Sequence, residues 1–81
     1  MEVSPNPFNE VTTISLNSKL QGDFNFQVFD LLGKQVHTSA INLREGKNTI
    51  EYNGSGLDNG IYIYTIENEL GAVSGKMVLK R

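Results

Sequence analysis

The sequence predicts an all-β domain, a seven-stranded immunoglobulin-like antiparallel β-sandwich. Short runs rich in β-branched and aromatic residues recur along the chain, and glycine, asparagine and aspartate separate them. No segment of useful length has the 3.6-residue periodicity of an amphipathic helix. An odd number of about seven strands in 81 residues favours two packed sheets over an up-and-down barrel.

The first half of the chain contains three of the predicted strands. A short strand over residues 2–4 ends at Pro5-Asn6-Pro7, because proline cannot donate to a strand ladder. Residues 11–17 alternate, with Thr12, Ile14 and Leu16 on one face. Residues 24–29 alternate most clearly, and their predicted core side chains are Phe24, Phe26 and Val28.

The rest of the chain contains the other four strands, over residues 34–41, 47–53, 61–67 and 73–80. In the fifth strand, Ile50 and Tyr52 are in phase. In the sixth, we expect Tyr62, Tyr64 and Ile66 to face the core. Its other face carries Ile61 and Ile63, and two apolar faces indicate a central strand.

Glycines end the predicted turns. Asp30-Leu31-Leu32-Gly33 and Leu57-Asp58-Asn59-Gly60 both fit a type I turn followed by a bulge. In such turns the last residue has a positive φ, which glycine tolerates without a steric penalty. We therefore expect Gly33 and Gly60 to have positive φ.

Length and composition restrict the protein class. Residues 1–81 fit a single domain, and no cysteine is present for a disulfide or a thiolate ligand. The net charge of −2 is too small to indicate nucleic acid or an anionic membrane surface as the main partner. No apolar run is long enough to span a bilayer, and the first residues do not have the pattern of a signal peptide.

The residues offer no catalytic set, so we expect no enzyme, no cofactor and no metal site. The only histidine is His37, and its neighbour Thr38 must face the opposite side of the strand. His37 is therefore interpreted as a solvent-facing strand residue. Asp58-Asn59-Gly60 lacks the alternating acids of a calcium loop and is interpreted as a turn.

Aromatic residues leave carbohydrate binding open as one class of function, because exposed rings can stack on sugars. Tyr62 and Tyr64 share a face with Ile66, which favours the core over a sugar platform. Only Phe29 and Tyr52 stay plausible as exposed rings.

The stretch Pro5-Asn6-Pro7-Phe8-Asn9 has two readings. Two prolines stiffen the backbone, and Phe8 offers a large apolar side chain. The stretch is either a rigid bend that carries the chain from one sheet to the other or a preorganised surface for a receptor. The residues are compatible with both.

The ordered set of motifs resembles a known family. These motifs are Ser4-Pro5-Asn6-Pro7-Phe8-Asn9, Thr12-Thr13-Ile14, Val28-Phe29-Asp30, Gly33-Lys34-Gln35-Val36, Leu57, Gly60-Ile61-Tyr62, Ser74-Gly75-Lys76, Val78 and Lys80. In this order they are similar to the type A C-terminal sorting domain of the type IX secretion system, the Por secretion system sorting domain family. The resemblance covers nearly the whole chain and includes the terminal Lys-Arg.

The resemblance implies a sorting function in Bacteroidota. In that family a seven-stranded immunoglobulin-like domain lies at the end of a secreted cargo protein. The cargo passes through the periplasm to an outer-membrane translocon and its shuttle proteins. A sortase-like protease then usually removes the domain and joins the cargo to the cell surface. The cargo and the cleavage segment do not form part of this sequence.

Ten residues are the expected recognition positions for that machinery: Pro5, Asn6, Pro7, Phe8, Gly33, Gly60, Tyr62, Lys76, Lys80 and Arg81. Lys76, Lys80 and Arg81 form a basic end on an otherwise acidic domain. The resemblance also fits an alternative, because the immunoglobulin-like domain of flagellar hook-capping proteins opens with a similar Pro-Asn-Pro-Phe-Asn stretch. That alternative implies a structural or surface-binding module.

Overall fold

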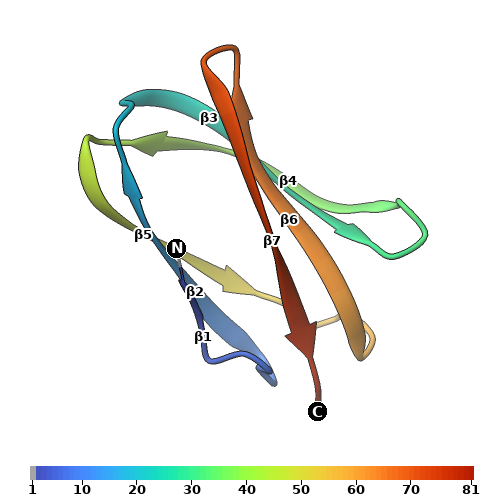
Figure 1. The fold of residues 1–81 in the computed structure, drawn as a ribbon. Coiled ribbons are helices and arrows are strands. Elements are labelled where there is room, and N and C mark those ends of the chain that lie inside the picture. The colour runs from blue at the N-terminus through green and yellow to red at the C-terminus, as the bar shows by residue number, and fades with distance from the viewer. Residues whose placement is uncertain (1) are drawn as a thin grey trace.

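The computed structural model describes residues 2–81 and confirms the predicted β-sandwich of two antiparallel sheets (Figure 1). The strands are β1 (Glu2–Ser4), β2 (Val11–Ser18), β3 (Gly22–Asp30), β4 (Gln35–Leu43), β5 (Gly46–Asn53), β6 (Gly60–Asn68) and β7 (Gly71–Leu79). One sheet has the order β1-β2-β5 and the other β4-β3-β6-β7. Within the described residues, no helix is long and apolar enough to cross a membrane.

The core lies between the two sheets and follows the period-2 pattern of the sequence. Phe24, Phe26 and Val28 on β3 are all buried, and so are Tyr62, Tyr64 and Ile66 on β6. These two strands are neighbours at the centre of the larger sheet, with Phe26 opposite Ile66 and Val28 opposite Tyr64. The predicted core faces and the central position of β6 are therefore confirmed.

The smaller sheet closes the core from the other side. Its contribution includes Ile14, Leu16 and Tyr52, which are buried, and Ile50, which is partly buried and packs against the same core. Thr12 is the one buried polar residue among residues 2–81, and its hydroxyl donates to the Pro5 carbonyl oxygen at 2.7 Å. A buried hydroxyl needs such a partner, because an unpaired one would lose its hydration without compensation.

The interpretation of His37 as a solvent-facing residue is wrong. His37 lies opposite the buried Val28 and in phase with Ile41 and Leu43, so its ring faces the interior, where it is half-buried. Its ring centroid lies 5.5 Å from that of Phe26 and 5.2 Å from that of Tyr52, with edge-to-face geometry in both pairs. His37 is therefore a packing residue of the edge strand, and its Nε2 lies 3.1 Å from the Ser39 hydroxyl.

The predicted glycine conformations are half right. Gly33 has a φ of +88°, as expected for the turn between β3 and β4. In that turn the Asp30 carboxylate accepts the backbone N–H groups of Leu32 and Lys34, both at 2.9 Å. Gly60 does not have a positive φ, because it is already the first residue of β6 and pairs with Leu79. The positive φ of that connection belongs to Gly56, at +92°.

Candidate functional site

Segments from both ends of the sequence meet at one end of the sandwich. The loop between β1 and β2, residues 5–9, lies beside the end of β7, residues 78–81, at the bottom of Figure 1. The β5–β6 loop, residues 54–59, completes this end. We call these three segments the terminal clasp.

Backbone hydrogen bonds hold the first two segments together. Phe8 forms a parallel bridge with Leu79: the Phe8 N–H donates to the Val78 carbonyl at 2.9 Å, and the Lys80 N–H donates to the Phe8 carbonyl at 2.8 Å. The Asn6 side-chain oxygen accepts the Val78 N–H at 2.9 Å. The loop therefore covers the final part of the β7 edge, which would otherwise present unpaired backbone groups.

The Phe8 side chain anchors this loop in the core. It is 2% exposed, so it is not the open apolar surface that one reading of the sequence suggests. Gly54 makes room for it: a Cβ there would lie 3.0 Å from Phe8 Cε2. The Gly54 N–H donates to the Glu10 carbonyl at 2.8 Å, which fixes this close approach. Glycine fits here because of proximity, without any positive φ: a larger residue would push against the buried Phe8 ring.

The bend itself also differs from the expectation. Residues 5–9 connect β1 and β2, which are paired neighbours in the same sheet, so the stretch does not carry the chain to the other sheet. It instead links the two sheets laterally, through the bridge from Phe8 to Leu79. The reading of the stretch as a bend from one sheet to the other is therefore wrong.

Arg81 is held against the β5–β6 loop. Its backbone N–H donates to the Asn59 side-chain oxygen at 2.9 Å. Its guanidinium donates to the carbonyl of Leu57 and, at 3.0 Å, to that of Gly54. The positive charge of Arg81 is thus placed by neutral carbonyl groups, and it keeps the loop closed over Phe8.

Tyr62 also holds the β5–β6 loop in place. Its hydroxyl donates to the Asp58 carbonyl at 2.6 Å, and the side chain is 7% exposed. Burial raises the pKa of the Tyr62 hydroxyl above 10.0, and the Asp58 and Asp30 carboxylates raise it further, while Arg81 lowers it. The tyrosine is therefore a neutral hydrogen-bond donor at neutral pH.

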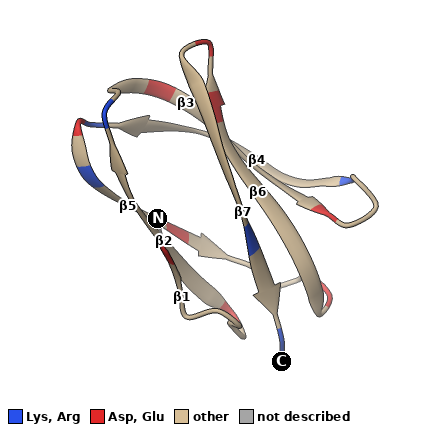
Figure 2. Ribbon diagram, viewed as in Figure 1, with Lys and Arg blue, Asp and Glu red and all other residues tan. Residues whose placement is uncertain are grey.

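The structure brings together eight of the ten expected recognition residues, namely Pro5, Asn6, Pro7, Phe8, Gly60, Tyr62, Lys80 and Arg81. A shallow recess on the clasp is lined by Asn9, Glu10, Ser55, Gly56, Lys80 and Arg81. Lys76 lies outside the clasp, exposed on β7 opposite Ile63. Gly33 lies in the β3–β4 turn. Figure 2 shows basic residues along the end of β7.

Sequence reasoning missed the residues of the β5–β6 loop, among them Gly54, Leu57 and Asn59. Leu57 and Gly54 contribute backbone carbonyl acceptors, Asn59 contributes its side-chain amide, and Gly54 also leaves room for Phe8 because it has no side chain. A sequence motif does not reveal such contacts. The sequence predicts Asn59 only as part of a turn.

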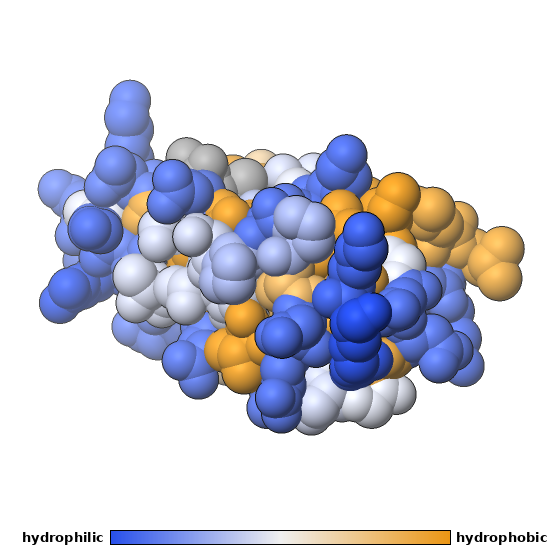
Figure 3. Space-filling view, turned by 90° about the horizontal axis from the view of Figure 1, so that it is seen from below, coloured by the Kyte–Doolittle hydropathy of each residue, from blue (hydrophilic) through white to orange (hydrophobic). Residues whose placement is uncertain are grey.

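The β3–β4 turn presents a different surface. Leu31 and Leu32 are 65% and 95% exposed, and this turn accounts for the hydrophobic projection at the right of Figure 3. The sugar-binding rings expected as an alternative are not presented: Tyr52 is 6% exposed and Phe29 is half-buried.

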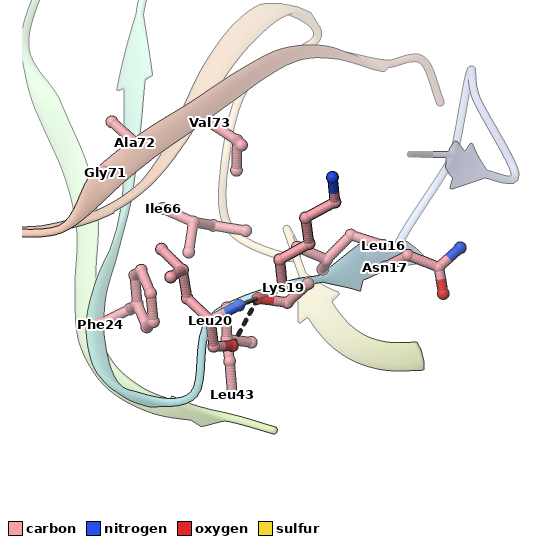
Figure 4. Close-up of a pocket in the computed structure, with 11 residues that line it drawn as sticks. Leu16, Asn17, Lys19, Leu20, Phe24, Leu43, Ile66, Gly71, Ala72 and Val73 are labelled. Atoms are coloured by element: carbon pink, nitrogen blue, oxygen red, sulfur yellow. Dashed lines mark hydrogen bonds between the residues drawn. The ribbon is translucent and has the colours of Figure 1, made fainter. Parts of the chain in front are cut away.

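An apolar pocket of about 240 Å³ lies at the opposite end of the sandwich (Figure 4). Its apolar lining consists of Leu16, Leu20, Phe24, Leu43, Ile66 and Val73. Lys19 is the one charged residue of the lining, so the pocket offers no pair of groups for acid–base chemistry. Across residues 2–81, no three histidine or acidic side chains are grouped closely enough to hold a metal ion.

A comparison with protein families identifies the chain's family. A family model described as a secretion system C-terminal sorting domain matches residues 2–80. The chain belongs to this family. No curated protein and no solved structure shows significant similarity to the chain.

Membership agrees with the resemblance seen in the motifs and identifies the chain as a C-terminal sorting domain of the type IX secretion system. Such a sorting domain implies a secreted protein that passes through the periplasm to the outer membrane or cell surface. The match covers all three segments of the terminal clasp up to Lys80.

Proposed function

We propose that the terminal clasp is the surface by which the secretion machinery recognises this sorting domain. The observation that carries the proposal is the bridge from Phe8 to Leu79, which joins motifs from the two ends of the sequence into one surface. The partners are the outer-membrane translocon and its shuttle proteins. The cargo is attached on the N-terminal side of the domain. Lys76 extends the surface along β7.

The clasp suits recognition because its shape is fixed before a partner binds. Arg81 and Asn6 each hold a segment of it through a hydrogen bond to a distant part of the chain, and Thr12 holds Pro5 from within the following strand. A preorganised surface loses little conformational entropy on binding, so more of the contact energy contributes to affinity. The Lys80 ammonium then adds charge attraction at the rim of the recess.

Two of the recognition residues, Tyr62 and Gly33, have supporting roles in this proposal. Tyr62 acts through the Asp58 carbonyl and keeps the β5–β6 loop in place. Gly33 fixes the turn that presents Leu31 and Leu32 as a second, apolar contact. After transit, a sortase-like protease removes the domain from the cargo.

Reporter export tests the proposal. The 81-residue domain, fused behind a signal peptide and a reporter, should carry the reporter out of a type IX-competent host. In a translocon mutant the fusion should accumulate in the periplasm. With the parent's upstream segment included, the exported reporter should lose about the 9.0 kDa of the domain, unless the protease is deleted.

Lysine variants locate the surface. Lys80→Ala should lower export several-fold, and Lys76→Ala combined with it should lower export further. Lys19→Ala is the matched control, because Lys19 is an exposed lysine at the opposite end of the sandwich. Equal export of all variants would exclude the clasp as the recognition surface. Retention of the intact fusion in a competent host would favour the alternative of a hook-cap-like structural module.

A further inference from the structure

The four edge strands of the sandwich are protected very unequally. Within residues 2–81, edge strand β1 is protected by its length of only three residues. Edge strand β5 is protected by its charged residues Lys47 and Glu51. Edge strand β7 carries Lys76, and Phe8 covers its final part. Edge strand β4, Gln35–Leu43, has nine residues without a single charge or proline. Natural proteins protect long edges with such residues, because an open edge pairs with other chains.

Most of β4 is regular enough to pair with another strand. Its one irregularity lies near the start, where the register shifts between the partners of Val28 and Phe29. From His37 to Leu43 the pairing with β3 continues without interruption. A regular, uncharged stretch of seven residues exceeds the usual minimum for a strand, whereas a bulge would have turned the edge away.

We infer that residues 37–43 of β4 form a docking edge for an extended strand of another protein. The added strand would bond its backbone to the free edge of β4 and continue the sheet beyond it. The edge lies on the far side of the sheet from β7, so the inference does not rest on the proposed role of the clasp.

The side chains on the two faces of β4 indicate which residue types the partner strand needs on each of its own faces. Ile41 faces the interior and is only partly buried, and His37 on the same face contacts Tyr52 of β5. An added strand would cover these apolar groups with apolar residues of its own. Thr38, Ala40 and Asn42 on the other face are exposed, so the alternate residues of the partner are small or polar.

Flanking charges distinguish a foreign strand from a second copy of this chain. Exposed cations stand at both ends of β4, Lys34 before it and Arg44 after it. Two copies paired antiparallel over residues 37–43 would place Arg44 of each copy opposite Val36 and diagonal to Lys34 of the other copy. Long side chains of like charge at this diagonal distance repel each other. A partner with acidic residues at both ends gains from the same two cations. The occupant is therefore an alternating, uncharged segment flanked by acids.

A synthetic peptide tests the inference on the intact 81-residue chain. In the probe, threonine and valine alternate between a pair of aspartates at each end. It should bind, and hydrogen exchange of amides in residues 37–43 should slow while amides of β7 stay unchanged. Replacing the aspartates by lysines should weaken binding by about tenfold. Protection of β7 instead of β4, or stronger binding of the lysine peptide, would overturn the inference.

Backbone methylation separates strand addition from simple side-chain contact without altering the protein. Successive amides of a strand point to opposite sides, so one probe is N-methylated at its odd residues and a second at its even residues. One probe should lose binding and the other should keep it. Equal binding of both would contradict the inference, and so would a dimer of the free domain that excludes the peptide.

Discussion

At the scale of single residues, Gly75 shows how a small residue completes the core. It lies on β7 opposite Tyr64, and a Cβ at Gly75 would lie 2.6 Å from Tyr64 Cζ and 2.7 Å from Tyr64 Cε2. Tyr64 is 1% exposed, so its ring has no open space into which it could move. The glycine hydrogen is therefore the only substituent that fits beneath the ring.

We expect Gly75→Ala to destabilise the domain by about 1–3 kcal/mol, because overpacking forces the buried ring or the strand to shift. The measurement is the free energy of unfolding from a denaturant titration. Gly71→Ala is the matched control on the same strand, since its Cβ would meet only Leu20 Cδ1, at 3.8 Å. Equal stability of the two variants would show that the Tyr64 ring moves freely.

The two turn glycines are expected to respond differently to substitution. Gly33→Ala places a Cβ on a residue with a φ of +88° and should destabilise by about 1–2 kcal/mol. Gly60→Ala should change stability by less than about 0.5 kcal/mol, since Gly60 has no positive φ and open space around its Cβ position. Thermal unfolding of both variants checks the difference, and a larger loss for Gly60→Ala would contradict it.

At the scale of elements, the β1–β2 loop connects the two sheets at their edges. Its backbone bridges to β7 while the Phe8 side chain fills the core below Gly54. Most core positions of this domain lie on strands and follow their alternation, but Phe8 does not. Removing its side chain should therefore affect both the core and the clasp.

Phe8→Ala should lower the free energy of unfolding by about 3–5 kcal/mol, the usual range for a buried phenylalanine. Locally, the amides of Val78 and Lys80 should exchange faster, because their acceptors Asn6 and Phe8 lose their support. Native-state hydrogen exchange measures this effect, with the amides of β6 as the internal reference. A uniform increase over the whole sheet would mean that the loop has no separate role at the β7 edge.

At the scale of the whole molecule, three core tyrosines link stability to alkaline pH. Burial raises the pKa values of Tyr52, Tyr62 and Tyr64 above the ordinary 10.0. The folded state therefore holds these protons more tightly than the unfolded state. Their contribution to stability is fully present below pH 10 and is lost as the pH rises through the folded pKa values.

The free energy of unfolding should accordingly decrease above about pH 10, together with ionisation of the tyrosines. Denaturant titrations between pH 8 and pH 12 and the ultraviolet absorbance of tyrosinate measure the two effects. Tyr52→Phe should reduce the slope above pH 10, because one of the three protons is no longer linked to folding. An unchanged slope in this variant would show that Tyr52 does not contribute.

Much of the fold follows from local pattern alone. Alternation predicts the faces of β3 and β6 correctly, because a strand with one buried face must place every second side chain there. The predicted range 2–4 matches β1, and the other predicted strands are one or two residues off at one or both ends. Strand ends depend on cross-strand hydrogen bonds, which a single segment does not contain.

The sequence by itself determined the fold class, the core faces and the family, because alternation, turn residues and ordered motifs are all local along the chain. Only the tertiary structure decided that Phe8 is buried and that Arg81 closes over Gly54. These placements arise from a parallel bridge and from carbonyl acceptors distant in sequence. Such interactions exist only after the two sheets have packed, so no periodicity predicts them.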